Sequence, residues 1–183
     1  GGLTAKIFDN FDKKEFLEKT AGLEGYLFPD TYLFLPGAET EQIIGTMRDN
    51  FKKKAGDIAQ DIVIMASLIE KEVPASDDRR IVSGILWKRL EIGMPLQVDA
   101  VFPYITGKRE VLLDDLKINS PYNTYLYKGL PPGPIANPGL DAIEAARNPK
   151  ETPYLYYISG KDGKTHFAKT YEEHLKNKEK YLR

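Results

Sequence analysis

The feature that most constrains the fold of this chain is a long segment rich in proline and glycine. Residues 119–139 carry five prolines and three glycines over 21 positions. Proline lacks a backbone donor and has a fixed φ, and glycine favours turns, so a regular helix or central strand cannot run through this stretch. We therefore expect a rigid loop with little freedom to collapse, with regular elements on either side of it.

On the N-terminal side, apolar residues recur mainly at helical spacing. Together with start and stop residues they predict helices over 11–20, 40–55, 61–73, 76–91, 97–106 and 111–118. Asp61 is expected to cap the third of these helices, and Pro74 to end it. Residues 24–36 are rich in aromatic side chains and suit two short extended pieces that bend at 28–30.

On the C-terminal side, the pattern predicts a short helix, a hairpin and a final charged helix. The helix covers 139–148, the hairpin strands cover 154–159 and 164–168, and the final helix covers 170–183. Helices and short strands are intermixed without the regular βαβ alternation of a parallel sheet. The predicted fold class is therefore α+β with a C-terminal β-hairpin, in one domain, which suits 183 residues.

Composition excludes several classes of function. The 26 basic and 27 acidic residues nearly balance, which argues against a non-specific nucleic-acid binder. The chain has no cysteine, so a thiol nucleophile, a disulfide framework and a cysteine-based zinc site are excluded. His166 and His174 fall on different predicted elements and do not suggest a metal site. No apolar run reaches the roughly 18–20 residues of a membrane span.

The predicted helix 61–73 carries the first candidate for acid–base chemistry. Its apolar stripe consists of Ile62, Met65, Ala66, Ile69 and Val73. Glu70 lies beside this stripe, where loss of hydration favours the protonated form of a carboxyl group, as a general acid requires. The structural alternative is a surface carboxylate at a helix end. Glu72 lies further round the helix and could instead pair with a cation.

Polar residues in two other segments are candidates for substrate contacts. Asn123, Thr124 and Tyr125 offer donors, acceptors and an aromatic face within the proline-rich frame, although the frame could also be purely structural. Gln97 and Asp99 flank a predicted helix start, where a helix-capping role is the alternative.

Glu24 and Asp30 bracket the aromatic turn near the N-terminus. For Asp30 a local hydrogen bond within the turn is the alternative to a role in substrate binding.

Taken in order, several segments resemble the endolytic murein transglycosylases of the YceG-like family. The matching segments are residues 23–32, 66–72, 89–99, 122–125, 129–135, 137–139, 154–157 and 166–167. The resemblance implies that residues 23–183 form the YceG-like catalytic domain. Residues 1–22 would then lead into it from a LysM-like region that precedes it in the family.

The resemblance also implies a substrate and a location. The substrate would be peptidoglycan glycan strands, and cell-wall synthases of the penicillin-binding protein class would be partners. Family members look like single-pass proteins of the cytoplasmic membrane with the catalytic domain on its outer side. Contact with the membrane would occur only through an N-terminal anchor that these residues do not include.

The implied reaction is cleavage of the β-1,4 bond between N-acetylmuramic acid and N-acetylglucosamine, with formation of 1,6-anhydro ends that help to terminate nascent strands. The first acid of the family's Glu-Lys-Glu motif falls on Glu70, which would be catalytic, with no metal or cofactor. The candidate substrate-binding residues are Glu24, Asp30, Gln97, Asp99, Tyr122, Asn123, Thr124, Tyr125, Pro132 and Asn137. The alternatives are a non-catalytic peptidoglycan-binding scaffold and a muramidase that uses water.

Overall fold

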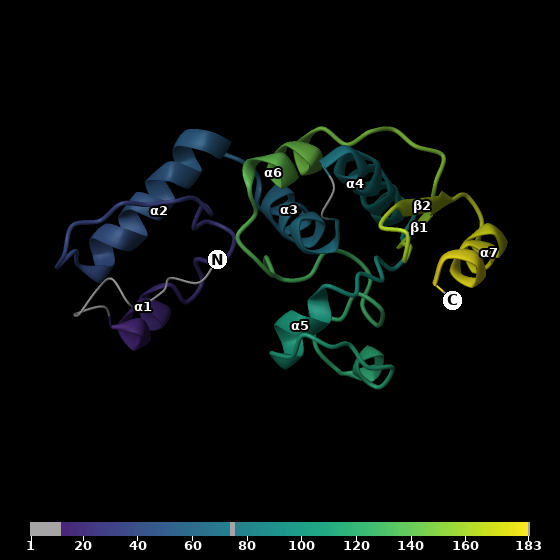
Figure 1. The fold of residues 1–183 in the computed structure, drawn as a ribbon, viewed down its shortest axis with the longest axis horizontal. Helices are drawn as coiled ribbons and strands as arrows, with labels where there is room; N and C mark the ends of the chain where they lie inside the picture. Colours follow the sequence, from purple (N-terminus) through teal and green to yellow (C-terminus); the bar gives the residue numbers. More distant parts are fainter. Residues whose placement is uncertain (1–11, 74–75, 183) are drawn as a thin grey trace.

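The helix that precedes Pro74 lies at the centre of the fold (Figure 1). In the computed structural model, which describes residues 12–73 and 76–182, this helix is α3 (Gln60–Glu72). Every residue from Val63 to Ile69 is buried, because α4 (Ser76–Glu91) and α6 (Leu140–Arg147) pack against it. A helix buried on all sides over two turns contributes most of its side chains to the hydrophobic core.

The remaining elements surround this three-helix centre. They are α1 (Lys13–Lys19), α2 (Thr40–Ala55), α5 (Val101–Thr106), the 3₁₀ turn η1 (Asp115–Lys117), β1 (Tyr156–Ser159), β2 (Thr165–Ala168) and α7 (Tyr171–Leu182). Helices α1 and α2 lie at one end of the molecule, and the hairpin with α7 lies at the other. The predicted α+β class with a C-terminal hairpin is confirmed.

Three local predictions need correction. Ala59, without a side-chain bond, caps α3, so Asp61 lies inside the first turn, where a carboxylate still complements the helix dipole. The helix expected over 97–106 begins only at Val101, and the one expected over 111–118 shortens to η1. The predicted stop at Pro74 lies outside the described residues.

Residues 24–36 form no β-strand, and the side chain of a distant residue takes two of their backbone donors. The Asn137 side-chain oxygen accepts hydrogen bonds from the backbone N–H groups of Gly25 (2.8 Å) and Leu27 (3.0 Å). Gly25 has φ +90°, and a β-carbon there would lie 2.6 Å from Pro134. This stretch therefore packs tightly against the proline-rich loop.

The proline-rich loop is bonded to the helical centre. The Ser67 hydroxyl of α3 accepts a hydrogen bond from the Ile135 N–H (3.0 Å), and the Thr124 hydroxyl accepts one from the Val98 N–H (3.0 Å). Side-chain partners of this kind allow an irregular backbone to be buried. As predicted, the segment is a loop, and it fixes the position of residues 97–98 in front of α3.

The hairpin is antiparallel, with Tyr157 opposite Phe167, and α7 packs on both strands. Arg89 of α4, only 5% exposed, donates hydrogen bonds to the carbonyl groups of Leu155 and Leu96, both at 2.7 Å. It thereby ties the hairpin to the segment that leads to α5.

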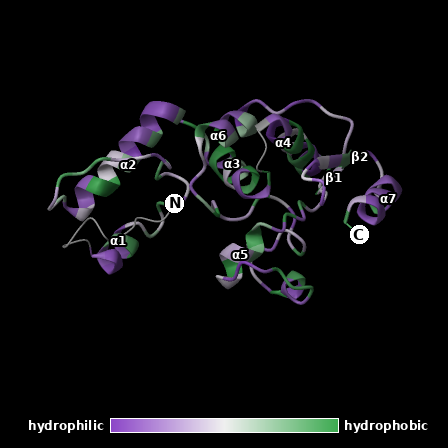
Figure 2. Cartoon of the chain, viewed as in Figure 1, coloured by the Kyte–Doolittle hydropathy of each residue, from purple (hydrophilic) through white to green (hydrophobic). Residues whose placement is uncertain are grey.

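Apolar residues concentrate where α3, α4 and α6 meet, whereas α7 is mainly hydrophilic (Figure 2). Within the described ranges, no helix has the length and apolar character needed to cross a membrane.

Candidate active site

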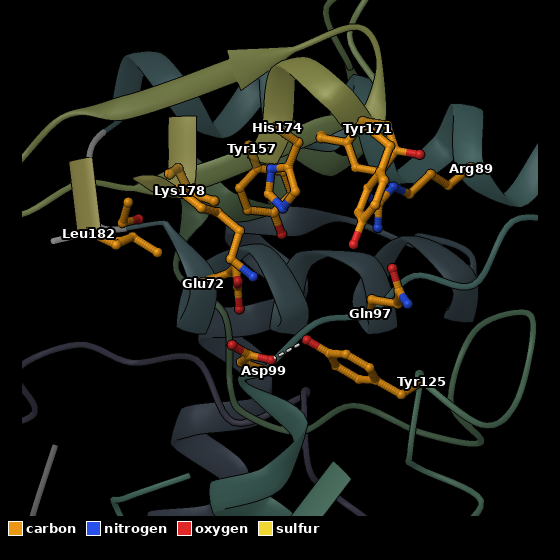
Figure 3. A pocket seen from close by; sticks show the side chains of 13 residues that line it. Glu72, Arg89, Gln97, Asp99, Tyr125, Tyr157, Tyr171, His174, Lys178 and Leu182 are labelled. Carbon is orange, nitrogen blue, oxygen red and sulfur yellow. Dashed lines mark hydrogen bonds between the residues drawn. The ribbon is translucent and has the colours of Figure 1, made fainter. Parts of the chain in front are cut away.

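A pocket of about 370 Å³ opens where the end of α3, residues 97–99, the hairpin and α7 meet (Figure 3). This volume suits a small ligand or a short piece of a polymer. Three of the predicted substrate-binding residues, Gln97, Asp99 and Tyr125, line it. The glutamate that lines the same pocket is Glu72.

Glu72 sits on the last turn of α3, and the protein environment raises the pKa of its carboxyl group to about 7. Burial is the largest cause of the increase, and the charge of Asp99 is the second. Hydrogen bonds with Tyr157 and with the Ala100 N–H oppose it; the Ala100 N–H donates to Oε2 at 3.3 Å. No basic side chain of the described residues lies within ion-pair distance of Glu72, so the possible pairing with a cation is not found there. A carboxyl group with this pKa can both donate and accept a proton near neutral pH.

Asp99 and Tyr125 form a fixed pair across the floor of the pocket. The Tyr125 hydroxyl donates a hydrogen bond to Asp99 Oδ1 at 2.5 Å. Burial and the charge of Asp99 raise the pKa of Tyr125, so this hydroxyl remains a donor. The helix-capping alternative is wrong for Asp99, because Ala100 occupies the N-cap of α5 and no side chain caps it. The Asp99 carboxylate is therefore directed toward the pocket.

Gln97 has an unusual backbone conformation. Its φ is +51°, and it is the one residue other than glycine with positive φ in the part of the chain that the structure describes. Such a conformation costs about 1–2 kcal/mol for a residue with a β-carbon. The backbone N–H groups of Gln97 and Val98 donate hydrogen bonds to the carbonyl (3.1 Å) and the hydroxyl (3.0 Å) of Thr124, which hold it there. Strain of this kind is concentrated at functional sites.

Glu70 lies on a different side of α3 and does not line this pocket. Its Oε2 accepts a hydrogen bond from the N–H of Gly139, the N-cap residue of α6, at 3.1 Å. Both terminal nitrogens of Arg79 lie 3.5 Å from the Glu70 carboxylate, and Arg79 also donates to Asp141 (3.1 Å) and to the Val73 carbonyl (2.8 Å). Glu70 thus connects α3 to α4 and α6, and its predicted catalytic role remains a prediction.

Asn123 and Thr124 are buried, with exposed fractions of 0% and 2%. The Asn123 amide donates to the carbonyl groups of Leu116 (3.0 Å) and Ile118 (2.9 Å), and its oxygen accepts from the Tyr125 N–H (3.0 Å). Direct substrate contact by these two residues remains a prediction. They shape the loop that presents Tyr125.

Asp30 has the local role that was the alternative to substrate binding. Its carboxylate accepts hydrogen bonds from the Thr31 N–H (2.9 Å) and the Asn50 amide (3.0 Å), and it pairs with Lys54 (3.0 Å). These contacts lower the pKa of Asp30 to about 2, and the hydrogen bond from Asn50 is the largest cause. Asp30 therefore joins the aromatic turn to α2 and does not line the pocket.

Four further candidates also lie away from the pocket. Glu24 is half-buried, and burial raises its pKa. The Tyr122 ring packs against Tyr104 at 4.9 Å, Pro132 is exposed, and Asn137 anchors the turn at residues 25–27. The structure therefore brings together only part of the predicted site.

Sequence reasoning missed the opposite wall of the pocket. That wall comes from the hairpin and α7 and includes Tyr156, Tyr157, Tyr171, His174 and Lys178. The tyrosines of the predicted strand were a signal, since aromatic side chains on a short hairpin must pack against another surface. The helix 170–183 carried no comparable signal.

His166 and His174 have separate surroundings. His166 Nε2 lies 3.1 Å from the Asp162 carboxylate in the hairpin turn, whereas His174 is stacked on Tyr156. In the described ranges no three histidine or acidic side chains are grouped as metal ligands would be.

Comparison with known proteins agrees with this architecture. The YceG-like family model matches residues 3–180. A relative from Bacillus subtilis (strain 168) named endolytic murein transglycosylase is 40% identical over 204 aligned positions, which cover 98% of this chain. A protein of the same name from Streptococcus pneumoniae is 34% identical over 173 positions and 85% of this chain.

A solved structure shares the fold. The crystal structure of a yceG-like protein from Listeria monocytogenes matches with a TM-score of 0.77 and 35% identity, over 90% of this chain and 64% of that chain. This chain spans 56% of the length of the Bacillus relative and 31% of the Streptococcus relative. By its sequence and its fold alike, the chain belongs to the YceG-like family.

Proposed function

We propose that this chain is the catalytic part of a lytic transglycosylase that cleaves the bond between N-acetylmuramic acid and N-acetylglucosamine inside peptidoglycan strands. The names of the curated relatives support the substrate and the class of enzyme. The observation that carries the proposal is Glu72, a carboxyl group with a pKa of about 7 in a pocket. A non-catalytic scaffold would have no need of such a group, since ionising it there costs free energy.

In the proposed reaction, protonated Glu72 donates its proton to the glycosidic oxygen, and the bond from that oxygen to C1 of muramic acid breaks. The resulting carboxylate takes the proton from the muramic O6 hydroxyl, and O6 bonds to C1 to close the 1,6-anhydro ring. Glu72 ends protonated, as it began. One carboxyl group suffices because the nucleophile belongs to the substrate, whereas hydrolytic glycosidases use two.

The neighbours of Glu72 suit this reaction. The Asp99 carboxylate provides negative charge in the pocket that would stabilise an oxocarbenium-like transition state, and Tyr125 holds it in place. Gln97 is exposed at the edge of the pocket, where its amide can bind a sugar hydroxyl or acetamido group.

The assignment of the acid to Glu72 differs from the sequence-based choice of Glu70. Glu72 lines the pocket together with Gln97, Asp99 and Tyr125, whereas Glu70 is bound to Arg79 and Gly139 between helices. Both belong to the same Glu-Lys-Glu motif, so the motif alone does not separate them. They form a matched pair for mutagenesis.

The experiment compares Glu72→Gln with Glu70→Gln on purified glycan strands, with products identified by mass spectrometry. We expect Glu72→Gln to lower turnover by about 10²–10⁴-fold or more, the usual worth of a positioned acid/base, and Glu70→Gln to retain turnover per folded molecule. Full activity of Glu72→Gln, with loss in Glu70→Gln at an unchanged melting temperature, would return the catalytic role to Glu70.

The same products test a second candidate, a muramidase that uses water. Asp99 beside Glu72 favours this alternative, because a second carboxylate could activate water. Anhydro ends are expected. Ends that borohydride reduces would instead identify the hydrolase.

For the whole protein we further propose what the family resemblance implies. A membrane anchor and a LysM-like region would precede residues 23–183, the catalytic domain would lie outside the cytoplasmic membrane, and cell-wall synthases would be partners. Cleavage next to a synthase would terminate nascent strands. Co-purification of the full-length protein with solubilised synthases tests the partnership.

A further inference from the structure

The two walls of the pocket differ in charge. Glu72 and Asp99 lie on the side formed by α3 and residues 97–99, whereas His174 and Lys178 come from α7 on the other side. Figure 3 shows His174 on the wall opposite Asp99 and Tyr125. A ligand in this pocket therefore meets acidic groups from α3 and residues 97–99, and basic groups from α7.

His174 belongs to the wall formed by the hairpin and α7. Its ring stacks on Tyr156, with centroids 5.3 Å apart, and lies 6.3 Å from the Tyr171 ring. Its Nδ1 is buried without a hydrogen-bond partner among residues 12–73 and 76–182. Burial lowers the pKa of His174, which favours the neutral form of the ring. The stacked ring therefore forms an aromatic part of the wall, on the same face of α7 as Lys178.

Lys178 provides the positive charge. It lies four residues after His174, so both side chains occupy one face of α7, and both line the pocket. No carboxylate of the described residues lies within ion-pair distance of Lys178. Arg89 also lines the pocket, but its guanidinium group already donates to the carbonyl groups of Leu155 and Leu96. Lys178 is therefore the cation best able to bind a ligand.

We propose that the wall formed by the hairpin and α7 is a subsite for the carboxylate-bearing substituent of muramic acid, with Lys178 binding the carboxylate and the His174 ring packing against the substituent. The inference rests on the proposed function, since it takes the substrate to be peptidoglycan. Only muramic acid among the two alternating sugars carries an acidic group, either the lactyl carboxylate itself or a carboxylate of the attached peptide.

This subsite would set the register of the strand. The 1,6-anhydro ring forms on muramic acid, so muramic acid must sit on one defined side of Glu72. N-acetylmuramic acid and N-acetylglucosamine have the same ring and the same acetamido group. Contacts with their hydroxyl groups alone therefore distinguish them weakly. A cation that attracts the acidic substituent on that side would disfavour the register in which N-acetylglucosamine takes its place.

The test measures binding in the chain carrying Glu72→Gln, so that the ligand is not consumed. Three tetrasaccharides are titrated by calorimetry: muramic acid-containing strands with peptide, the same strands without peptide, and an all-N-acetylglucosamine chain. Lys178→Gln should weaken binding of a muramic acid ligand about 5–20-fold and leave the all-N-acetylglucosamine chain unchanged. Lys176→Gln removes the same charge from an exposed position that does not line the pocket and should change nothing.

Selective loss with the peptide-bearing ligand alone would locate the carboxylate on the peptide, and loss with the peptide-free ligand would locate it on the lactyl group. Equal weakening of all three ligands, or no weakening by Lys178→Gln, would overturn the subsite. Product analysis of the unmutated protein distinguishes failure of the subsite from failure of the proposed function. Anhydro products with no effect of Lys178→Gln refute the subsite alone, and selective binding without anhydro products refutes the reaction alone.

Discussion

Replacing Glu72 with glutamine should stabilise the protein at alkaline pH while it abolishes turnover. The pKa of Glu72 rises from an ordinary 4.5 to about 7, mainly through burial. The folded protein therefore binds this proton more tightly than the unfolded chain does. As pH increases from about 4.5 to about 7, the unfolded chain ionises first, so the wild-type protein loses stability across this window.

The magnitude follows from the same two values. The gap between 4.5 and about 7 corresponds to about 3 kcal/mol at 1.36 kcal/mol per pKa unit. Glutamine keeps the shape and can accept the hydrogen bond from the Ala100 N–H, but it never ionises. At about 2–4 °C per kcal/mol for a chain of this size, the melting temperature at pH 8 should increase by about 6–12 °C.

The assay is thermal unfolding followed by circular dichroism between pH 4 and pH 8.5. The difference between Glu72→Gln and wild type should be near zero below pH 4.5, grow up to pH 7 and then remain constant. Glu70→Gln is the control, because it weakens the contacts of a largely buried arginine, Arg79, and should lower the melting temperature. A pH-independent difference, or a destabilised Glu72→Gln at pH 8, would refute the assignment of an ionisation cost to Glu72.

Two further predictions concern the loop and the strained residue. Asn123→Ala should lower the free energy of unfolding by about 1–3 kcal/mol, because the carbonyl groups of Leu116 and Ile118 and the Tyr125 N–H lose a buried partner. Denaturant unfolding measures this loss. Turnover per folded molecule should stay within a few-fold of wild type. A large fall in turnover at normal stability would instead indicate a direct role of Asn123 in substrate binding. Gln97→Gly should raise the free energy of unfolding by about 1 kcal/mol by removing left-handed strain, while Gln97→Ala keeps the strain. Both variants should lose turnover if the amide binds the sugar, and wild-type turnover in either would show that the strain serves only the backbone.

Much of the architecture could be predicted because it depends on local patterns. The helix 40–55 has the predicted limits, and the hairpin turn at 160–163 joins the two expected strands. The proline-rich segment is a loop because its backbone chemistry permits little else. Residues 24–36 were less predictable, since the distant Asn137 takes two of their backbone donors.

The Glu-Lys-Glu motif also identified the end of α3 that borders the pocket. It did not show which of its two glutamates faces the pocket. Val63 to Ile69 are all buried, so α3 has no continuous polar face in its centre from which orientation can be read. From its position on the helix, Glu70 was predicted to lie beside apolar residues. In the tertiary structure it instead contacts Arg79 and the N–H of Gly139.

The sequence by itself determined the loop, the hairpin and most of the helices, because hydrophobic periodicity and the backbone limits of proline and glycine act over a few residues. Only the tertiary structure decided the composition of the site. Glu72, Asp99, Tyr125 and Tyr157 come from separate segments, and the pKa of Glu72 depends on burial and on the charge of Asp99, 27 positions away. Burial and electrostatic coupling of this kind arise only when distant segments pack together, so they have no signature in the local sequence.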